Sequence, residues 1–374
     1  MHDSFACQSP DPREMPGCEG ELFRRRVRAT ALLDLAENVG AERRAEISRE
    51  IIALGEAALP ALHRAVASRR ENAAALSRGL IRILLPDEIG REIHAGLARE
   101  KKNYRVEHGA VQLSRLCYPN IPVQRVLRDI DELASRATDY ISTALSITQK
   151  EVKRAANRDT IEVVKSLGSF WREEGFQGRS DNFYTEKNSY MSDVIERRTG
   201  LPITLSVLYL AIARRVHLNA EGVGLPGHFI VRVAIAGGEG EHFTLIDPFN
   251  GAHSIDLGDC RERVESMGQP FLPEEHLRPV TPREILGRMC NNLLALFNHQ
   301  KKSLESERVA TVLAHLQPGD PIPPLLRGER RLRRGDRKGA RADFERARTL
   351  DPHGPIGRTA AEMIERMSYE NPFA

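Results

Sequence analysis

His228 and Asp247 are the residues of this 374-residue chain whose types and spacing best suit proton transfer. Each lies in a short segment of alternating apolar residues, which predicts two strands. Between them, the glycine-rich residues 237–240 predict a hairpin turn. If the hairpin is symmetric about that turn, paired residue numbers sum to about 477, which puts both side chains on one face within reach of each other. A carboxylate that orients an imidazole would create a general base.

The chain offers neither a metal site nor a cysteine beside this pair. No two of its five cysteines form a C-x-x-C pair, so neither a disulfide framework nor a structural zinc site is predicted. Three of them, Cys117, Cys260 and Cys290, lie in segments that read as helix or loop. The remaining histidines of this region, His217, His242 and His253, lack the spacing of zinc ligands. We therefore expect no metal and no cofactor.

The elements that must position His228 include a buried helix. Residues 203–216 are apolar nearly all round, as in a helix enclosed on every side, and Pro202 suits its first position. Before it, a short helix is expected to be capped by Asn188 or Ser189 and to end at Gly200.

At this point the sequence resembles a known family. The stretch NSYMSDVIERRTGLPITLSVLYLAIARRVHLNAEGVGLPGHFIVRV, followed by LIDPFNG, is similar to bacterial transglutaminase-like proteins of the SirB-type invasion-regulator family. The resemblance implies an α+β core of the transglutaminase/papain-like (cysteine proteinase) type. In active relatives a cysteine begins the central helix, a histidine acts as base and an aspartate orients it.

The resemblance also implies that Pro202 occupies the nucleophile position, so that His228 and Asp247 are the remnant of a degenerate triad. Thr204 cannot replace the cysteine, because residues two apart on a helix differ by about 200° of rotation. Ser206 lies in the same early part of the helix. Asn188 and Asn250, which fall in the matching segments, are candidate binding residues, although Asn188 also suits a helix cap.

Helical segments flank this core. Residues 1–24 read as a disordered tail and residues 25–103 as helices, in which LGEAALPALHRAV is similar to the first helix of a HEAT repeat. The core with its helical lead-in covers residues 104–281. Residues 282–374 resemble tetratricopeptide repeats, because Pro318 precedes Pro352 by one period of about 34 residues. We therefore expect all-α, repeat-like segments on both sides.

Composition narrows the class of protein. With 55 basic and 52 acidic residues the net charge is only +3, which gives no general basis for nucleic-acid binding. We see neither a signal peptide nor an apolar stretch long enough for a membrane, and expect a cytoplasmic protein.

These features favour an adaptor or regulator that binds a protein or peptide partner through its helical repeats and the relic cleft. The alternative is a hydrolase or acyl-transfer enzyme that uses His228 and Asp247 without a covalent cysteine. A third possibility is a scaffold in which the core is only a spacer.

Overall fold

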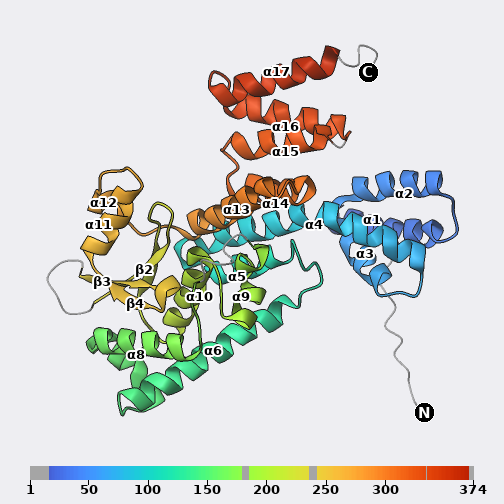
Figure 1. Ribbon diagram of the computed structural model, residues 1–374. Helices are drawn as coiled ribbons and strands as arrows, with labels where there is room; N and C mark the ends of the chain where they lie inside the picture. Colours follow the sequence, from blue (N-terminus) through green and yellow to red (C-terminus); the bar gives the residue numbers. More distant parts are fainter. Residues whose placement is uncertain (1–16, 179–184, 236–241, 334, 370–374) are drawn as a thin grey trace, which may run out of the picture. The chain divides into compact units, whose positions relative to one another are not determined.

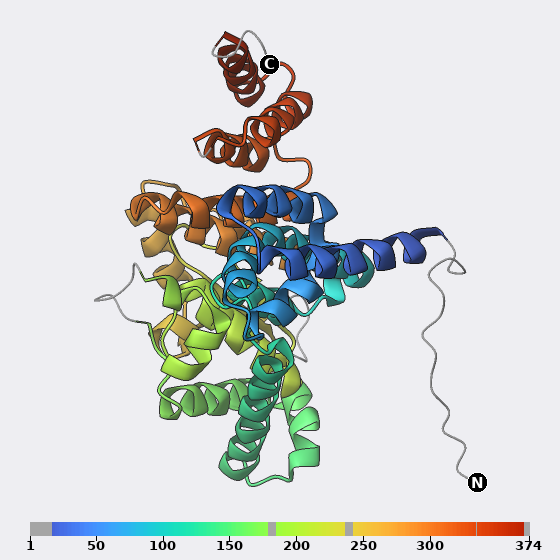
Figure 2. The same ribbon diagram turned by 90° about the vertical axis from the view of Figure 1, so that its right-hand side faces the viewer.

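The computed structural model describes residues 17–178, 185–235, 242–333 and 335–369 (Figures 1 and 2). The chain divides into two compact units between Glu88 and Ile89, inside helix α4 (Glu71–Glu100). The second half of α4 belongs to the second unit because it packs there: the His94 Nδ1 atom lies 2.9 Å from the carbonyl oxygen of His315. The division therefore comes earlier than the boundary after residue 103 that the sequence suggested.

The first unit is helical. Its elements before α4 are α1 (Gly17–Ala36), α2 (Ala41–Leu54), η1 (Gly55–Ala58) and α3 (Leu59–Val66). Residues 17–24, which the sequence assigned to a tail, are the first turns of α1, where Glu21 and Arg25 form an ion pair one turn apart. Residues 1–16 lie outside the described part of the chain. The buried apolar side chains of the unit include Leu33, Ile47, Ile51, Leu59 and Leu62.

A four-stranded antiparallel sheet lies in the second unit. Its strands, in spatial order, are β1 (Ala220–Val223), β2 (Ile230–Ala234), β3 (Phe243–Asp247) and β4 (His253–Ile255). Val231 pairs with Ile246, so paired numbers of β2 and β3 sum to 477 and the predicted register is confirmed. The expected turn at residues 237–240 lies outside the described residues. His228 lies just before β2 instead of within it, because Gly227 has a left-handed φ of 65° that interrupts the extended chain.

Helix α10 (Pro202–Arg215) is the centre of this unit, and every residue from Pro202 to Ala213 is buried, as predicted. It packs on β1 and β2 and on α5 (Val106–Ser114), α6 (Val123–Ala144) and α9 (Met191–Arg197). The other helices of the core are η2 (Lys101–Asn103), α7 (Gln149–Arg158), α8 (Thr160–Glu173), η3 (Glu186–Asn188), η4 (Pro248–Asn250), α11 (Leu257–Ser266) and α12 (Pro273–His276).

An ion-pair cluster holds the far end of α10. The fully buried carboxylate of Glu107 accepts hydrogen bonds from Arg214 at 3.1 Å and from Arg215 at 2.9 Å. Both arginines lie in the last turn of α10, where positive charge also stabilises the helix dipole. Because Glu107 belongs to α5, the cluster fixes α10 against that helix.

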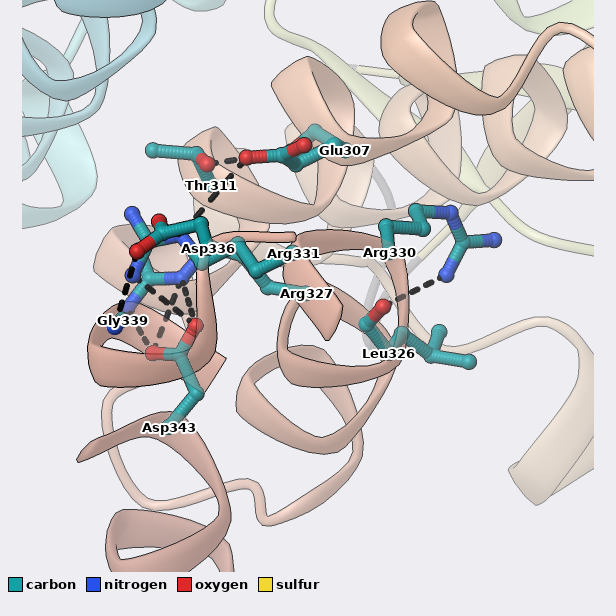
Figure 3. A network of polar contacts seen from close by, with 9 residues as sticks. All are labelled: Glu307, Thr311, Leu326, Arg327, Arg330, Arg331, Asp336, Gly339 and Asp343. Carbon is teal, nitrogen blue, oxygen red and sulfur yellow. Dashed lines mark hydrogen bonds and ion pairs between the residues drawn. The ribbon is translucent and has the colours of Figure 1, made fainter. Parts of the chain in front are cut away.

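Five helices complete the chain: α13 (Pro282–His299), α14 (Ser303–Leu316), α15 (Ile322–Arg333), α16 (Arg337–Leu350) and α17 (Pro355–Tyr369). Each packs on the next, as the orange to red elements of Figure 1 show. Figure 3 shows a polar network between α14, α15 and α16, in which Arg327 and Arg331 of α15 converge on the buried Asp343 of α16, at 2.6 and 3.0 Å. None of the described helices is both long and apolar enough to cross a membrane.

Candidate functional site

His228 and Asp247 are joined directly, as the hairpin register predicted. The His228 Nε2 atom lies 2.8 Å from Asp247 Oδ2, and both side chains are buried. Among the described residues no hydrogen bond to the Nδ1 atom of His228 is found. The imidazole is thus held at one nitrogen, and the other stays available for a proton or a ligand.

The Asp247 carboxylate is fixed by the turn that follows it. Its Oδ1 atom accepts hydrogen bonds from the backbone N–H of Phe249 at 3.1 Å and of Asn250 at 3.3 Å, and its Oδ2 atom accepts one from the Asn250 side-chain amide at 2.7 Å. Burial alone would raise the pKa of this carboxyl, but the bonds from His228 and Asn250 outweigh it and lower the pKa below its usual value. Asp247 is therefore a carboxylate that orients the histidine and also begins the turn.

Trp171 supports this turn from behind. Its indole Nε1–H donates a hydrogen bond of 3.0 Å to the carbonyl oxygen of Pro248, the residue next to Asp247. The ring stacks on Phe176 with centroids 4.4 Å apart and meets the edge of Tyr209, a residue of α10, at 5.5 Å. The tryptophan thus links α8, α10 and the turn.

A cleft of about 610 Å³ opens beside His228. The start of α10 forms one wall, with Leu201, Pro202 and Ile203, and the loop of Gly227, His228 and Phe229 forms another. The third wall is one face of α13, from which five side chains line the cleft: Arg288, Asn292, Ala295, Leu296 and His299. Sequence reasoning missed this third wall. The sequence pattern that could have revealed this wall is the spacing of those five residues, which follows the three- and four-residue intervals of one helix face.

Pro202 and His228 line the same cleft, as expected if the proline stands where a nucleophile would be. Neither hydroxyl that follows on α10 replaces it. Ser206 is buried and donates a hydrogen bond to the carbonyl oxygen of Phe229 at 3.1 Å, and Thr204 is fully buried and does not line the cleft. The start of α10 therefore presents no side-chain nucleophile to His228.

The thiols of Cys117, Cys260 and Cys290 are not activated either. Burial raises the pKa of Cys117, raises that of Cys260 to about 11 and raises that of Cys290 to about 12. Cys260 lines a separate cavity of about 440 Å³, together with Asp247 and Asn250. A thiol with such a pKa stays protonated at neutral pH and is a poor nucleophile.

Neither of the two predicted binding residues, Asn188 and Asn250, lines the cleft. Asn250 supports Asp247 and lies in the second cavity rather than in the cleft. Asn188 is not a helix cap, because it ends η3 and helix α9 begins only at Met191, after Tyr190. Its Oδ1 atom accepts a hydrogen bond of 3.1 Å from Arg197 and its carbonyl one of 3.0 Å from Leu201, so Asn188 positions the start of α10.

Within the described ranges, no three His, Cys, Asp or Glu side chains converge in a way that could hold a metal ion.

A cysteine placed at residue 202 would test the proposed nucleophile position. We expect the thiol of Pro202→Cys to have a pKa lowered from about 8.5 to roughly 5.5–7.5, because the N-terminus of α10 and His228 both stabilise a thiolate. The measurement is the pH dependence of alkylation by iodoacetamide, with the unmodified protein as background. In Pro202→Cys combined with His228→Ala the pKa should rise again. A pKa at or above 8.5 in the single variant would show that residue 202 is not coupled to His228.

Comparison with known proteins identifies the core. Residues 124–291, which include Pro202, His228 and Asp247, match the family model of the transglutaminase-like superfamily. The second unit of this chain therefore contains a transglutaminase-like domain. No solved structure matches the chain significantly.

Homologues of this region occur in bacteria and animals. A UPF0162 protein of Xylella fastidiosa (strain 9a5c) is 35% identical over 183 residues, 48% of this chain and 64% of that protein. A UPF0162 protein of Pasteurella multocida (strain Pm70) is 24% identical over 241 residues, 63% of this chain and 88% of its own length. F-box only protein 21 of Pongo abelii is 34% identical over 131 residues, 32% of this chain and 20% of that protein. The chain thus spans less than two thirds of the Xylella protein.

Proposed function

We propose that this protein is a non-catalytic adaptor, whose transglutaminase-like core binds a peptide or another small ligand in the cleft beside His228. The observation that carries the proposal is an open cleft of about 610 Å³ with an intact histidine–aspartate pair, but with a proline at the position that the resemblance assigns to the nucleophile. A pocket of this size, lined by both apolar and polar side chains, is within the range of small-ligand sites.

The helical segments are the second part of the proposal. We assign the helices from residue 282 onward to a tetratricopeptide-like module and those of residues 25–103 to a HEAT-like one, both binding protein partners in the bacterial cytoplasm. The consecutive packing of α13 to α17 supports the first assignment. Because α13 also lines the cleft, a partner of this module and a ligand of the cleft would share one helix.

Blocking the cleft tests the first part. Ala295 is exposed on α13 and lines the cleft, so Ala295→Trp should fill it and abolish binding of peptide or fragment ligands found by ligand-observed NMR. The matched control is Ala342→Trp on the exposed surface of α16, which should bind as the unmodified protein does. We expect His228→Ala to weaken binding roughly tenfold, as the loss of a charge-assisted hydrogen bond would. Binding that survives Ala295→Trp, His228→Ala and Asp247→Ala alike would contradict a ligand site in this cleft.

The free Nδ1 side of His228 supports a second candidate, an enzyme that performs hydrolysis or acyl transfer without a covalent intermediate. A positioned histidine typically accelerates such steps 10²–10⁴-fold as a general base. The ligands found in the screen, together with thioesters, amides and peptides, are therefore also tested for turnover. Turnover that depends on pH and is lost in His228→Ala would favour the enzyme, and its absence across the set would favour the adaptor.

A further inference from the structure

Arg288 of α13 is a cation in the wall of the cleft, and no described carboxylate pairs with it. Its Nη2 atom donates hydrogen bonds to the carbonyl oxygens of Leu225 at 2.9 Å and His228 at 3.5 Å, and its guanidinium lies 5.6 Å from the centre of the Phe229 ring. No ion pair to Arg288 is found within the part of the chain that the structure describes. A guanidinium has five N–H donors, so those on Nε and Nη1 remain to be satisfied.

The nearest acidic residue on the same helix, Glu284, is already bonded to other groups. Glu284, one turn before Arg288, accepts a hydrogen bond of 2.8 Å from Arg278 and one of 2.7 Å from the backbone N–H of Thr281. These bonds, of which that from Arg278 is the strongest, lower the pKa of Glu284 to about 2. Its negative charge is thus neutralised by Arg278 and the Thr281 turn, and it does not line the cleft.

The cleft as a whole favours negative charge. The ionisable side chains among its described lining residues are Arg288, His228 and His299, and no carboxylate is among them. The start of α10, at Leu201, Pro202 and Ile203, adds the positive end of the dipole of a 14-residue helix. Two independent elements, α13 through Arg288 and α10 through its N-terminus, therefore present positive potential to one space.

We infer that the ligand of this cleft carries a carboxylate, which binds the guanidinium of Arg288 beside His228. The inference rests on the proposed function and names the chemical class of its ligand. The donors on Nε and Nη1 can form charge-assisted hydrogen bonds with a carboxylate, which are stronger than the bonds that they would form with a neutral amide. The free C-terminus of a peptide and a small organic acid both supply this group.

Gly224 makes room for this guanidinium. A Cβ atom built on Gly224 would lie 1.8 Å from Arg288 Nη1, so any side chain at this position must displace the end of the arginine. Because the displaced atoms are the far end of a flexible side chain, Gly224→Ala should fold normally while moving the charge. Gly224→Ala thus keeps the guanidinium of Arg288 but changes its position, so the variant tests whether the position matters.

The test compares three probes: N-acetyltrialanine with a free carboxylate, the same peptide as its amide, and propionate. Binding is followed by the ring Cε1–Hε1 NMR signals of His228 and His299 in the full chain with labelled histidine. We expect the carboxylate peptide to bind at least roughly tenfold more tightly than the amide. Propionate binding as tightly as the peptide would identify a small acid as the ligand, and weaker binding would identify a peptide C-terminus.

Variants decide whether Arg288 is responsible. Arg288→Gln should remove the preference for the carboxylate, and Gly224→Ala should reduce it. Arg341→Gln, which removes the same charge from an exposed i,i+4 pair with Glu345, should keep it. A preference that survives Arg288→Gln, or the absence of binding by both acids, would overturn the inference. Equal binding of acid and amide would overturn it too, while leaving the cleft as a ligand site.

Discussion

Replacing Trp171 by alanine should lower the free energy of unfolding by about 3–5 kcal/mol, the range for large aromatic residues removed from a packed core. The side chain is fully buried between Phe176 and Tyr209, and its indole N–H is bonded to the carbonyl of Pro248. Its loss leaves a cavity and an unsatisfied carbonyl immediately after Asp247. We therefore expect Trp171→Ala also to abolish ligand binding in the cleft.

The measurement for Trp171 is urea unfolding followed by circular dichroism. Trp171→Phe is the matched variant, because it keeps most of the stacked area and loses the hydrogen bond, and it should cost roughly 1–2 kcal/mol. A loss below about 1 kcal/mol for Trp171→Ala would contradict the role of this residue as the packing link between α8, α10 and the turn.

The second large effect is expected at Asp247. Asp247→Ala removes the acceptor of four hydrogen bonds, from His228, from the backbone N–H of Phe249 and Asn250 and from the Asn250 amide. Leaving several buried donors unsatisfied should cost roughly 2–4 kcal/mol at pH 7. The exposed carboxylate of Asp131, paired with Arg215, is the control, and Asp131→Ala should change stability by less than about 1 kcal/mol.

This effect should depend on pH in a defined direction. The pKa of Asp247 is lowered in the folded protein, so its carboxylate stabilises the fold above the unfolded-state pKa of about 3.9. That contribution is lost as the pH falls through the lower folded-state pKa. The stability difference between the unmodified protein and Asp247→Ala, measured by urea unfolding at several pH values, should therefore shrink below about pH 4. A difference that grew on acidification would contradict this assignment.

The parts of the site that sequence predicted are those set by local geometry. Alternation and turn position were sufficient to place His228 and Asp247 on one face within reach of each other, because the pleat repeats every two residues and the hairpin is local. The all-round apolar pattern of residues 203–216 likewise predicted a buried helix that Pro202 begins. The identity of Pro202 as a vacated nucleophile position came from the family resemblance alone.

The parts that sequence missed depend on long-range packing. The predicted start of α9 was wrong. Asparagine is common at helix N-caps, but the side chain of Asn188 is bonded to Arg197 instead. The wall of α13 was missed because its repeat-like spacing indicated a separate module, and no local pattern states which face of a helix packs on a distant loop. The contacts of Arg288 with the carbonyl oxygens of Leu225 and His228 are long-range in sequence, so no local pattern pointed to them.

The position of Trp171 has a practical consequence. It is the only tryptophan of the chain, and its indole N–H is bonded to the residue next to Asp247. The tryptophan fluorescence of the protein, excited selectively over that of its tyrosines, therefore arises from a single chromophore behind the histidine–aspartate pair. Shifts of that turn on ligand binding would change the emission, so occupancy of the cleft can be titrated in the unlabelled protein, without a substrate and without a dye.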